Sequence, residues 1–231
     1  MSELVRRANY AVFQHLRDEG LHVVRSHLGE IHAALLGYPT YAALALEARG
    51  ASTGAHLCDA QVIALDQKAG EARAAELLSS LPPARRQDVI EQCSLALAEC
   101  AAPITVFESV DDLFDDWAKD QIASLALDAE DLNPAVRMVL GEPVVEGTWR
   151  ASGSLWHSRL DWVIEAYGTV REIDDDGVSV DGGVVLGWRG RLVFTKAGRA
   201  GLIVDTGGAS CRPLDADQES DREWYAMDGC D

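Results

Sequence analysis

The sequence predicts an α+β protein, in which an α-helical N-terminal part over residues 1–143 precedes a small barrel-like or curled antiparallel sheet over residues 144–213. Two observations lead to this class. In the first part, apolar residues recur three or four positions apart, as on the buried face of a helix. From Val144 onward, the apolar runs become short and glycines separate them, which is typical of strands joined by tight turns. Residues 214–231 are predicted to be a polar, acidic tail.

Three helices are expected within the first fifty residues. The first has a buried stripe formed by Val5, Ala8, Val12 and Leu16. The second is expected to begin at a Ser26 N-cap and to end at Gly37, and the third to begin at Pro39. These short helices have the outline of a helix-turn-helix, but residues 39–47 contain no base. A DNA-reading helix would present basic residues there, so direct binding of double-stranded DNA is not expected.

The same region carries a resemblance, through Ser26, His27, Glu30, Ile31, Ala33, Gly37, Tyr38, Tyr41, Ala43 and Leu44. It resembles a short helical region in uncharacterised bacterial proteins of plasmids and integrative elements, a region loosely labelled glyoxalase-related. The resemblance covers about 30 residues and implies a mobile-element setting. Glyoxalase activity would need paired βαβββ modules and a His/Glu metal set, and the sequence shows neither.

The middle of the chain alternates short strands with long helices. Residues 61–65 and 104–107 are expected to be strands. Between them, residues 67–80 are rich in strong helix formers, and a further helix is expected from Pro83 to about Cys100.

Acidic residues dominate the composition, with 38 acids against 20 bases and a net charge of −18. Residues 101–150 hold 11 of these acids against 3 bases. A helix is expected there after a Ser109 N-cap, and its exposed carboxylates are predicted to be the partner-binding group: Asp111, Asp112, Asp115, Asp116 and Asp120. Asp112 and Asp116 are four residues apart, so they should share one helix face.

Three interpretations of this acidic stretch stay open. It is a solvated helix face, a surface that imitates DNA phosphates or binds another basic partner, or a divalent metal site. The third is disfavoured because no twelve-residue calcium loop with a terminal Glu can be aligned. No metal and no cofactor are therefore predicted.

The β-rich part combines arginine with tryptophan. Its predicted strands are residues 167–173, 178–180, 184–188, 191–195 and 201–205, with a hairpin turn at Asp174–Gly177. Trp188, Arg189 and Arg191 are the residue types of interface hot spots, and stacking on such residues also holds single-stranded nucleic acid. They are predicted as a second partner-binding group.

Membrane-spanning segments, a signal region and paired-cysteine motifs are all missing from the sequence. It has no apolar run long enough for a membrane span and no apolar signal region, so a cytoplasmic location without membrane contact is expected. Its five cysteines include no Cys-x-x-Cys, which disfavours a disulfide framework or a zinc ribbon. Cys93 and Cys100 lie seven apart on one helix, where buried thiols are favoured over a redox or metal pair.

The leading hypothesis is a non-enzymatic, acidic interaction or inhibitor protein of a mobile element or phage. It would occupy a basic, nucleic-acid-binding site on a host protein complex, as an anti-defence DNA mimic does. One alternative is an accessory module that contacts single-stranded nucleic acid or protein through the β-rich part. Another is a metal- or His-dependent enzyme, for which His157 with Asp161 is the first candidate pair. The oligomeric state is left open.

Overall fold

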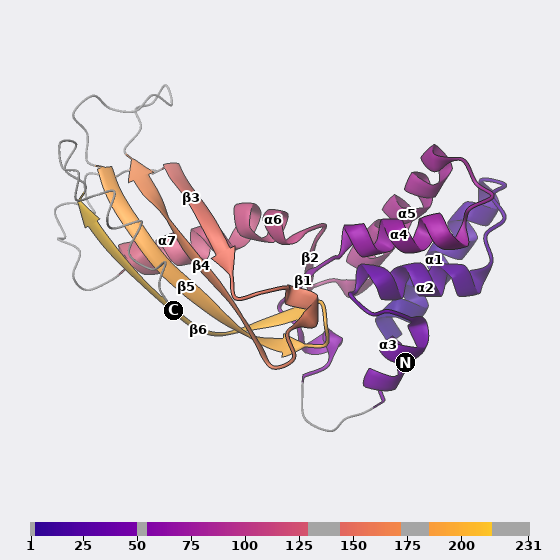
Figure 1. The fold of residues 1–231 in the computed structure, drawn as a ribbon, viewed down its shortest axis with the longest axis horizontal. Coiled ribbons are helices and arrows are strands. Elements are labelled where there is room, and N and C mark those ends of the chain that lie inside the picture. The colour runs from indigo at the N-terminus through magenta and orange to yellow at the C-terminus, as the bar shows by residue number, and fades with distance from the viewer. Residues whose placement is uncertain (1–2, 50–54, 129–143, 172–184, 214–231) are drawn as a thin grey trace. The chain divides into compact units, whose positions relative to one another are not determined.

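The computed structural model describes residues 3–49, 55–128, 144–171 and 185–213. Helices predominate in the N-terminal part and strands in the C-terminal part, so the predicted α+β class is confirmed (Figure 1). The sheet is curled as expected. It is mixed and not purely antiparallel, because its two short strands from the helical part pair in parallel.

The helical elements, in chain order, are α1 (Glu3–Asp18), α2 (Arg25–Leu35), α3 (Tyr41–Glu47), the 3₁₀ turn η1 (Leu57–Asp59), α4 (Gln67–Leu77), α5 (Pro83–Ala101), α6 (Val110–Leu113), the π-helical turn η2 (Phe114–Ala118), α7 (Lys119–Leu127) and the 3₁₀ turn η3 (Leu155–His157). The strands are β1 (Val62–Ala64), β2 (Thr105–Phe107), β3 (Val144–Ala151), β4 (Asp161–Arg171), β5 (Val185–Ala197) and β6 (Gly201–Pro213).

Two compact units divide the chain, and each draws segments from both sides of residue 144. Unit 1 comprises Met1–Leu113, Gly153–Trp162 and Phe194–Val204. Unit 2 comprises Phe114–Ser152, Val163–Val193 and Asp205–Asp231. Strands β5 and β6 therefore contribute residues to both units.

The strand order in the sheet is β2-β1-β6-β5-β4-β3. β1 pairs in parallel with β2, with Ile63 opposite Val106, and antiparallel with β6, with Val62 opposite Leu202. β3 and β4 form an antiparallel pair in which Arg150 faces Glu165. These two side chains form an ion pair with 2.7 Å between Nη2 and Oε2.

The core of unit 1 is helical. α1 packs on α5 and α2, and α4 packs on α2 and α5 (Figure 1). The predicted stripe of α1 is confirmed, since its four members are all buried: Val5, Ala8, Val12 and Leu16. All three residues of β1 are buried as well, so this strand joins the helical core to the sheet.

Side-chain caps or a proline mark the starts of α3, α4 and α5. Thr40 caps α3 by accepting a hydrogen bond from the Ala43 amide at 3.1 Å, and Asp66 caps α4 in the same way. Pro83 stands in the first turn of α5, as predicted. The predicted Ser26 cap is wrong: α2 begins at Arg25, and the side chain of its N-cap residue makes no capping hydrogen bond. The apolar packing of α2 fixes its start without a cap.

Gly70 sets the separation of α2 and α4. A Cβ atom at this position would lie 2.5 Å from Leu35 Cδ2 and 2.9 Å from Cγ, and Leu35 is fully buried. We expect Gly70→Ala to lower the free energy of unfolding by about 2 kcal/mol, because overpacking outweighs the better helix propensity of alanine. Urea denaturation measures the change. Gly208→Ala, where a Cβ meets no atom within 4 Å, is the control and should change stability little. An unchanged midpoint for Gly70→Ala would contradict this packing.

In unit 2, α7 lies against one face of β5 and β6 (Figure 1). A Cβ at Gly190 on β5 would lie 2.6 Å from Ile122 of α7, and one at Gly207 on β6 would lie 2.6 Å from Leu125. The prediction of two separate strands at 184–188 and 191–195 is wrong, because β5 runs unbroken through Gly190. Gly190 lets α7 pack closely against β5, because it has no side chain, and it does not form a turn. The predicted Asp174–Gly177 turn, the 178–180 strand and the acidic tail lie outside the described residues.

Candidate functional site: an acidic pocket and the acidic residues that follow it

A polar depression of about 540 Å³ lies in unit 1, on the exposed side of α4 and α5. We call it the acidic pocket, and it is lined by Gln67, Glu71, Gln87, Glu91, Gln92, Ser94, Leu95 and Glu108. Three of these side chains are carboxylates and none is basic. Among the described residues, Glu71, Glu91 and Glu108 form no ion pair. The pocket therefore offers negative charge that the described part of the protein does not neutralise.

Helical spacing places these groups. Gln67 and Glu71 are one turn apart on α4, and Gln87 and Glu91 are one turn apart on α5, so each pair projects from one helix face. The Gln67 amide donates to Ser94 Oγ at 3.0 Å and so bridges the two helices. Glu91 accepts a hydrogen bond from the Gln87 amide at 3.3 Å. Amides and carboxylates in this arrangement accept hydrogen bonds from guanidinium or ammonium groups.

The predicted acidic helix begins directly after this pocket. Glu108 closes the pocket, and Ser109 then starts the turn that leads into Asp111 and Asp112. Ser109 Oγ accepts from the Asp112 amide at 3.0 Å and donates to its carboxylate at 2.8 Å, so the predicted Ser109 cap is confirmed. Asp112 thus has a structural contact, whereas the exposed side chain of Asp111 has no such bond to Ser109.

The five predicted aspartates are all exposed, but they do not belong to one unit. Asp111 and Asp112 fall in unit 1, and Asp115, Asp116 and Asp120 fall in unit 2. The segment is an α-helix over α6 and a π-helical turn over η2, so Asp112 and Asp116 do not stand on one continuous α-helix. Their alignment on one helix face stays a prediction.

The second predicted partner-binding group, Trp188, Arg189 and Arg191, is divided between the two faces of strand β5. Arg189 and Arg191 are exposed, whereas Trp188 is fully buried and lies over Gly147. Successive residues of a strand face opposite sides, and Gly190 faces α7. The two arginines therefore lie on the face away from α7, and the Trp188 ring lies on the other. The structure does not bring them together as one stacking surface.

Among the described residues, no hydrogen bond or ion pair joins the candidate pair His157 and Asp161. His157 is exposed, and its Nδ1 lies 2.9 Å from Ser154 Oγ, three residues earlier in the same 3₁₀ turn. Among the described residues, no three His, Cys, Asp or Glu side chains converge closely enough to hold a metal ion.

A buried polar cluster lies deeper in unit 1, around Lys196 of β5. Its Nζ donates to the carbonyl oxygen of Arg199 at 2.6 Å, and its side chain is only 4% exposed. Burial lowers the pKa of Lys196 to about 7, Glu47 opposes that shift, and Arg199 adds to it. The hydroxyl of Tyr38 donates to Glu47 at 2.8 Å and accepts from the Arg199 amide at 3.1 Å. The cluster ties the end of α2 to the β5–β6 turn inside the fold.

The three glutamates of the acidic pocket were not predicted from the sequence. Their signal was present, since acids and amides recur at helical spacing on residues 67–71 and 87–91. It was not specific, because such residues cover most solvated helices. Only the packing of α4 beside α5 brings the two faces together.

The described cysteines differ in how deeply they are buried. Cys93 is fully buried, as predicted for a core thiol, and burial raises its pKa. Cys100 is half-buried, Cys58 is exposed, and both are free thiols.

None of the described helices combines the length and the apolar character needed to cross a membrane. Comparisons of the chain with protein-family models, with curated proteins and with solved structures gave no match.

Proposed function

We propose that this chain is a non-enzymatic interaction protein whose acidic pocket receives basic side chains of a partner. The observation that carries the proposal is the set of three carboxylates around one depression, with no base in its lining. Arg or Lys side chains of a partner would find charge and hydrogen-bond acceptors there together. Asp111 and Asp112, which follow Glu108 in the chain, would extend the contact.

A partner that fits the acidic pocket must present clustered Lys and Arg side chains. Such a basic surface is common on proteins that bind nucleic acid, because these side chains neutralise the phosphates. The proposed partner is therefore a nucleic-acid-binding protein or complex of a host cell, and the proposed effect is inhibition by occupying its basic site. A mobile-element or phage-like origin and action in the cytoplasm belong to this proposal. The net charge of −18 supports it by steering basic partners toward the chain.

The test uses an arginine-rich nonapeptide as the probe and isothermal titration as the measurement. We expect the triple variant Glu71→Gln, Glu91→Gln and Glu108→Gln to weaken binding about tenfold, because each exposed charge pair contributes about 0.5 kcal/mol. The side chains stay similar in size and the sites are exposed, so the fold should persist. Circular dichroism checks that it does.

A control of equal charge separates the pocket from general attraction. The triple variant Asp18→Asn, Glu19→Gln and Glu99→Gln removes the same charge from exposed positions outside the pocket. We expect it to weaken binding much less than the pocket variant. If both variants weaken the peptide equally, the pocket has no special role and only the net charge acts.

The alternative of nucleic-acid contact through Arg189 and Arg191 has a separate test. Fluorescence anisotropy with a labelled single-stranded oligonucleotide would detect it, and the Arg189→Gln, Arg191→Gln variant would abolish it. We do not favour this alternative, because Trp188 is buried on the other face of β5.

A further inference from the structure

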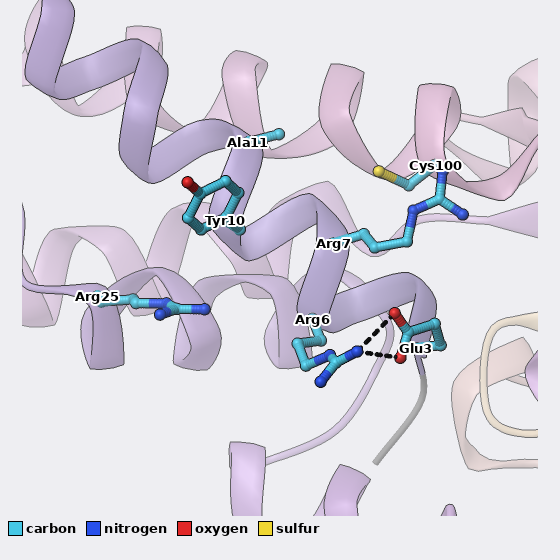
Figure 2. Close-up of a pocket in the computed structure, with 7 residues that line it drawn as sticks. All are labelled: Glu3, Arg6, Arg7, Tyr10, Ala11, Arg25 and Cys100. Atoms are coloured by element: carbon cyan, nitrogen blue, oxygen red, sulfur yellow. Dashed lines mark hydrogen bonds and ion pairs between the residues drawn. The ribbon is translucent and has the colours of Figure 1, made fainter.

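A second depression in unit 1 has the opposite charge. It measures about 480 Å³ and lies between α1, the start of α2 and the end of α5 (Figure 2). We call it the arginine pocket, and its lining is Glu3, Arg6, Arg7, Tyr10, Ala11, Arg25 and Cys100. Three guanidinium groups against one carboxylate make it a basic site on a strongly acidic chain.

The pocket already holds one carboxylate, which belongs to the protein. Arg6 Nη2 donates to both oxygens of Glu3, at 2.7 and 2.6 Å (Figure 2). The hydrogen bond from Arg6 is the main cause that lowers the pKa of Glu3, and the charges of Arg6 and Arg7 lower it further. The charge of Arg6 is therefore already paired within α1.

Two of the arginines keep their charge available. Among the described residues, neither Arg7 nor Arg25 forms an ion pair. Figure 2 shows the Arg7 side chain extending toward Cys100 of α5. The Arg25 guanidinium lies 5.7 Å from the centre of the Tyr10 ring, which holds it by a cation–π contact while its N–H groups stay accessible.

The rest of the lining is largely carbon. The exposed ring of Tyr10, the methyl group of Ala11 and the arginine stems supply apolar surface beside the charges. The volume lies in the range of small-molecule sites, which combine an apolar wall with a few polar groups. An oxyanion alone would leave this wall unused, so the complementary ligand carries an apolar body as well.

We propose that the arginine pocket binds a small organic anion, in which a carboxylate or phosphate group is attached to an aromatic or other apolar body. Arg7, which extends toward Cys100, receives the anionic group, and the Tyr10 ring, on which Arg25 lies, packs on the body of the ligand (Figure 2). This site is independent of the acidic pocket and of the function proposed for it.

Cys100 makes the proposal measurable, because its half-buried thiol stands in the pocket wall. In a Cys58→Ser, Cys211→Ser, Cys230→Ser background, only Cys100 and the buried Cys93 remain. The thiolate of Cys100 attacks one sulfur of dithiobis-nitrobenzoate, an aromatic dicarboxylate disulfide. A mixed disulfide forms, the S–S bond of the reagent breaks, and a nitrothiobenzoate thiolate leaves with its absorbance. Dithiodipyridine, a neutral aromatic disulfide, reacts in the same way and reports thiol reactivity alone.

We expect Arg7→Gln, Arg25→Gln to slow the anionic reagent about tenfold while changing the neutral one about twofold or less, because the charge contact of Arg7 and the more distant attraction of Arg25 together contribute about 1.4 kcal/mol. Glu3→Gln should do the reverse and accelerate the anionic reagent, since it releases Arg6. All three sites are exposed, so the fold should tolerate these changes. Equal slowing of both reagents, or no slowing of either, would overturn the proposal.

Non-reactive ligands complete the experiment and identify the anionic group. Naphthoate and naphthyl phosphate are added while the neutral reagent reacts with Cys100. Protection by one or both supports the site and shows whether carboxylate or phosphate is preferred, and protection should disappear in Arg7→Gln, Arg25→Gln. If neither compound protects Cys100 at millimolar concentration, the pocket does not bind organic anions.

Discussion

Replacing Lys196 by methionine should raise the free energy of unfolding at pH 7 by about 3 kcal/mol. Burial lowers the pKa of Lys196 from 10.5 to about 7, which corresponds to a penalty of about 5 kcal/mol for the charged amine. Methionine fills similar space without charge. It gives up the hydrogen bond to the Arg199 carbonyl and leaves that acceptor unpaired, which costs about 2 kcal/mol and reduces the gain.

The lowered pKa of Lys196 also determines how the free energy of unfolding changes with pH. Between pH 7 and 10.5 the unfolded chain keeps the Lys196 proton and the folded chain has lost it. The unfolded state therefore binds more protons, and stability rises with pH across this window. Relative to Lys196→Met, the natural protein should gain about 4 kcal/mol from pH 7 to 10.5.

Urea denaturation at several pH values tests this, with Lys68→Met as the control because Lys68 is exposed on α4. The control should show a flat difference across the same window. A stability difference between Lys196→Met and the natural protein that does not change with pH would mean that the amine is not desolvated as the structure indicates.

Acid should destabilise the protein through His32, and His32→Leu should remove that effect. His32 lies on α2 with no exposed surface, and neither ring nitrogen has a hydrogen-bond partner of good geometry. Burial lowers its pKa from 6.5 to about 4, although the backbone of Leu28 and Cys93 partly favours the charged ring. The folded protein therefore holds His32 neutral.

The sign follows from the lowered pKa. Between pH 6.5 and 4 the unfolded chain takes up a proton at His32 and the folded chain does not, so stability falls as the pH falls. The loss attributable to His32 should be about 3 kcal/mol by pH 4. Carboxylates also titrate in this range, so the quantity to measure is the difference between the natural protein and His32→Leu.

Thermal denaturation followed by circular dichroism at pH 7, 5.5 and 4 provides that difference. His22→Leu is the matched control, because His22 is exposed. If leucine disturbs the α2 packing, His32→Met provides a more adaptable apolar replacement. Equal acid sensitivity in the natural protein and in both His32 variants would show that this ring is not held neutral.

Local chemistry explains why the helices were predictable. The stripe of α1, the proline at the start of α5 and the Ser109 cap of α6 are each set by residues within a few positions of one another. The exposure of Asp111 and Asp116 followed in the same way from their charge.

The errors occurred where distant residues decide the outcome. Gly190 has the residue type of a turn, but it lies within β5 because Ile122 of α7 packs over it. Ser26 has the residue type of a cap, but α2 begins before it. Trp188 is a residue type that is common at protein interfaces, but here its ring fills the space above Gly147.

The sequence by itself determined the α+β class, the strong negative charge and the exposure of the acidic helix, because periodicity and charge are local properties of the chain. Tertiary structure alone decided which charges share a site. Glu71, Glu91 and Glu108 surround one pocket because α4 packs beside α5, and Arg7, Arg25 and Cys100 surround another because α1 packs between α2 and α5. Those contacts join residues far apart in the chain, and the energy that selects them comes from burying the apolar helix faces opposite the two pockets.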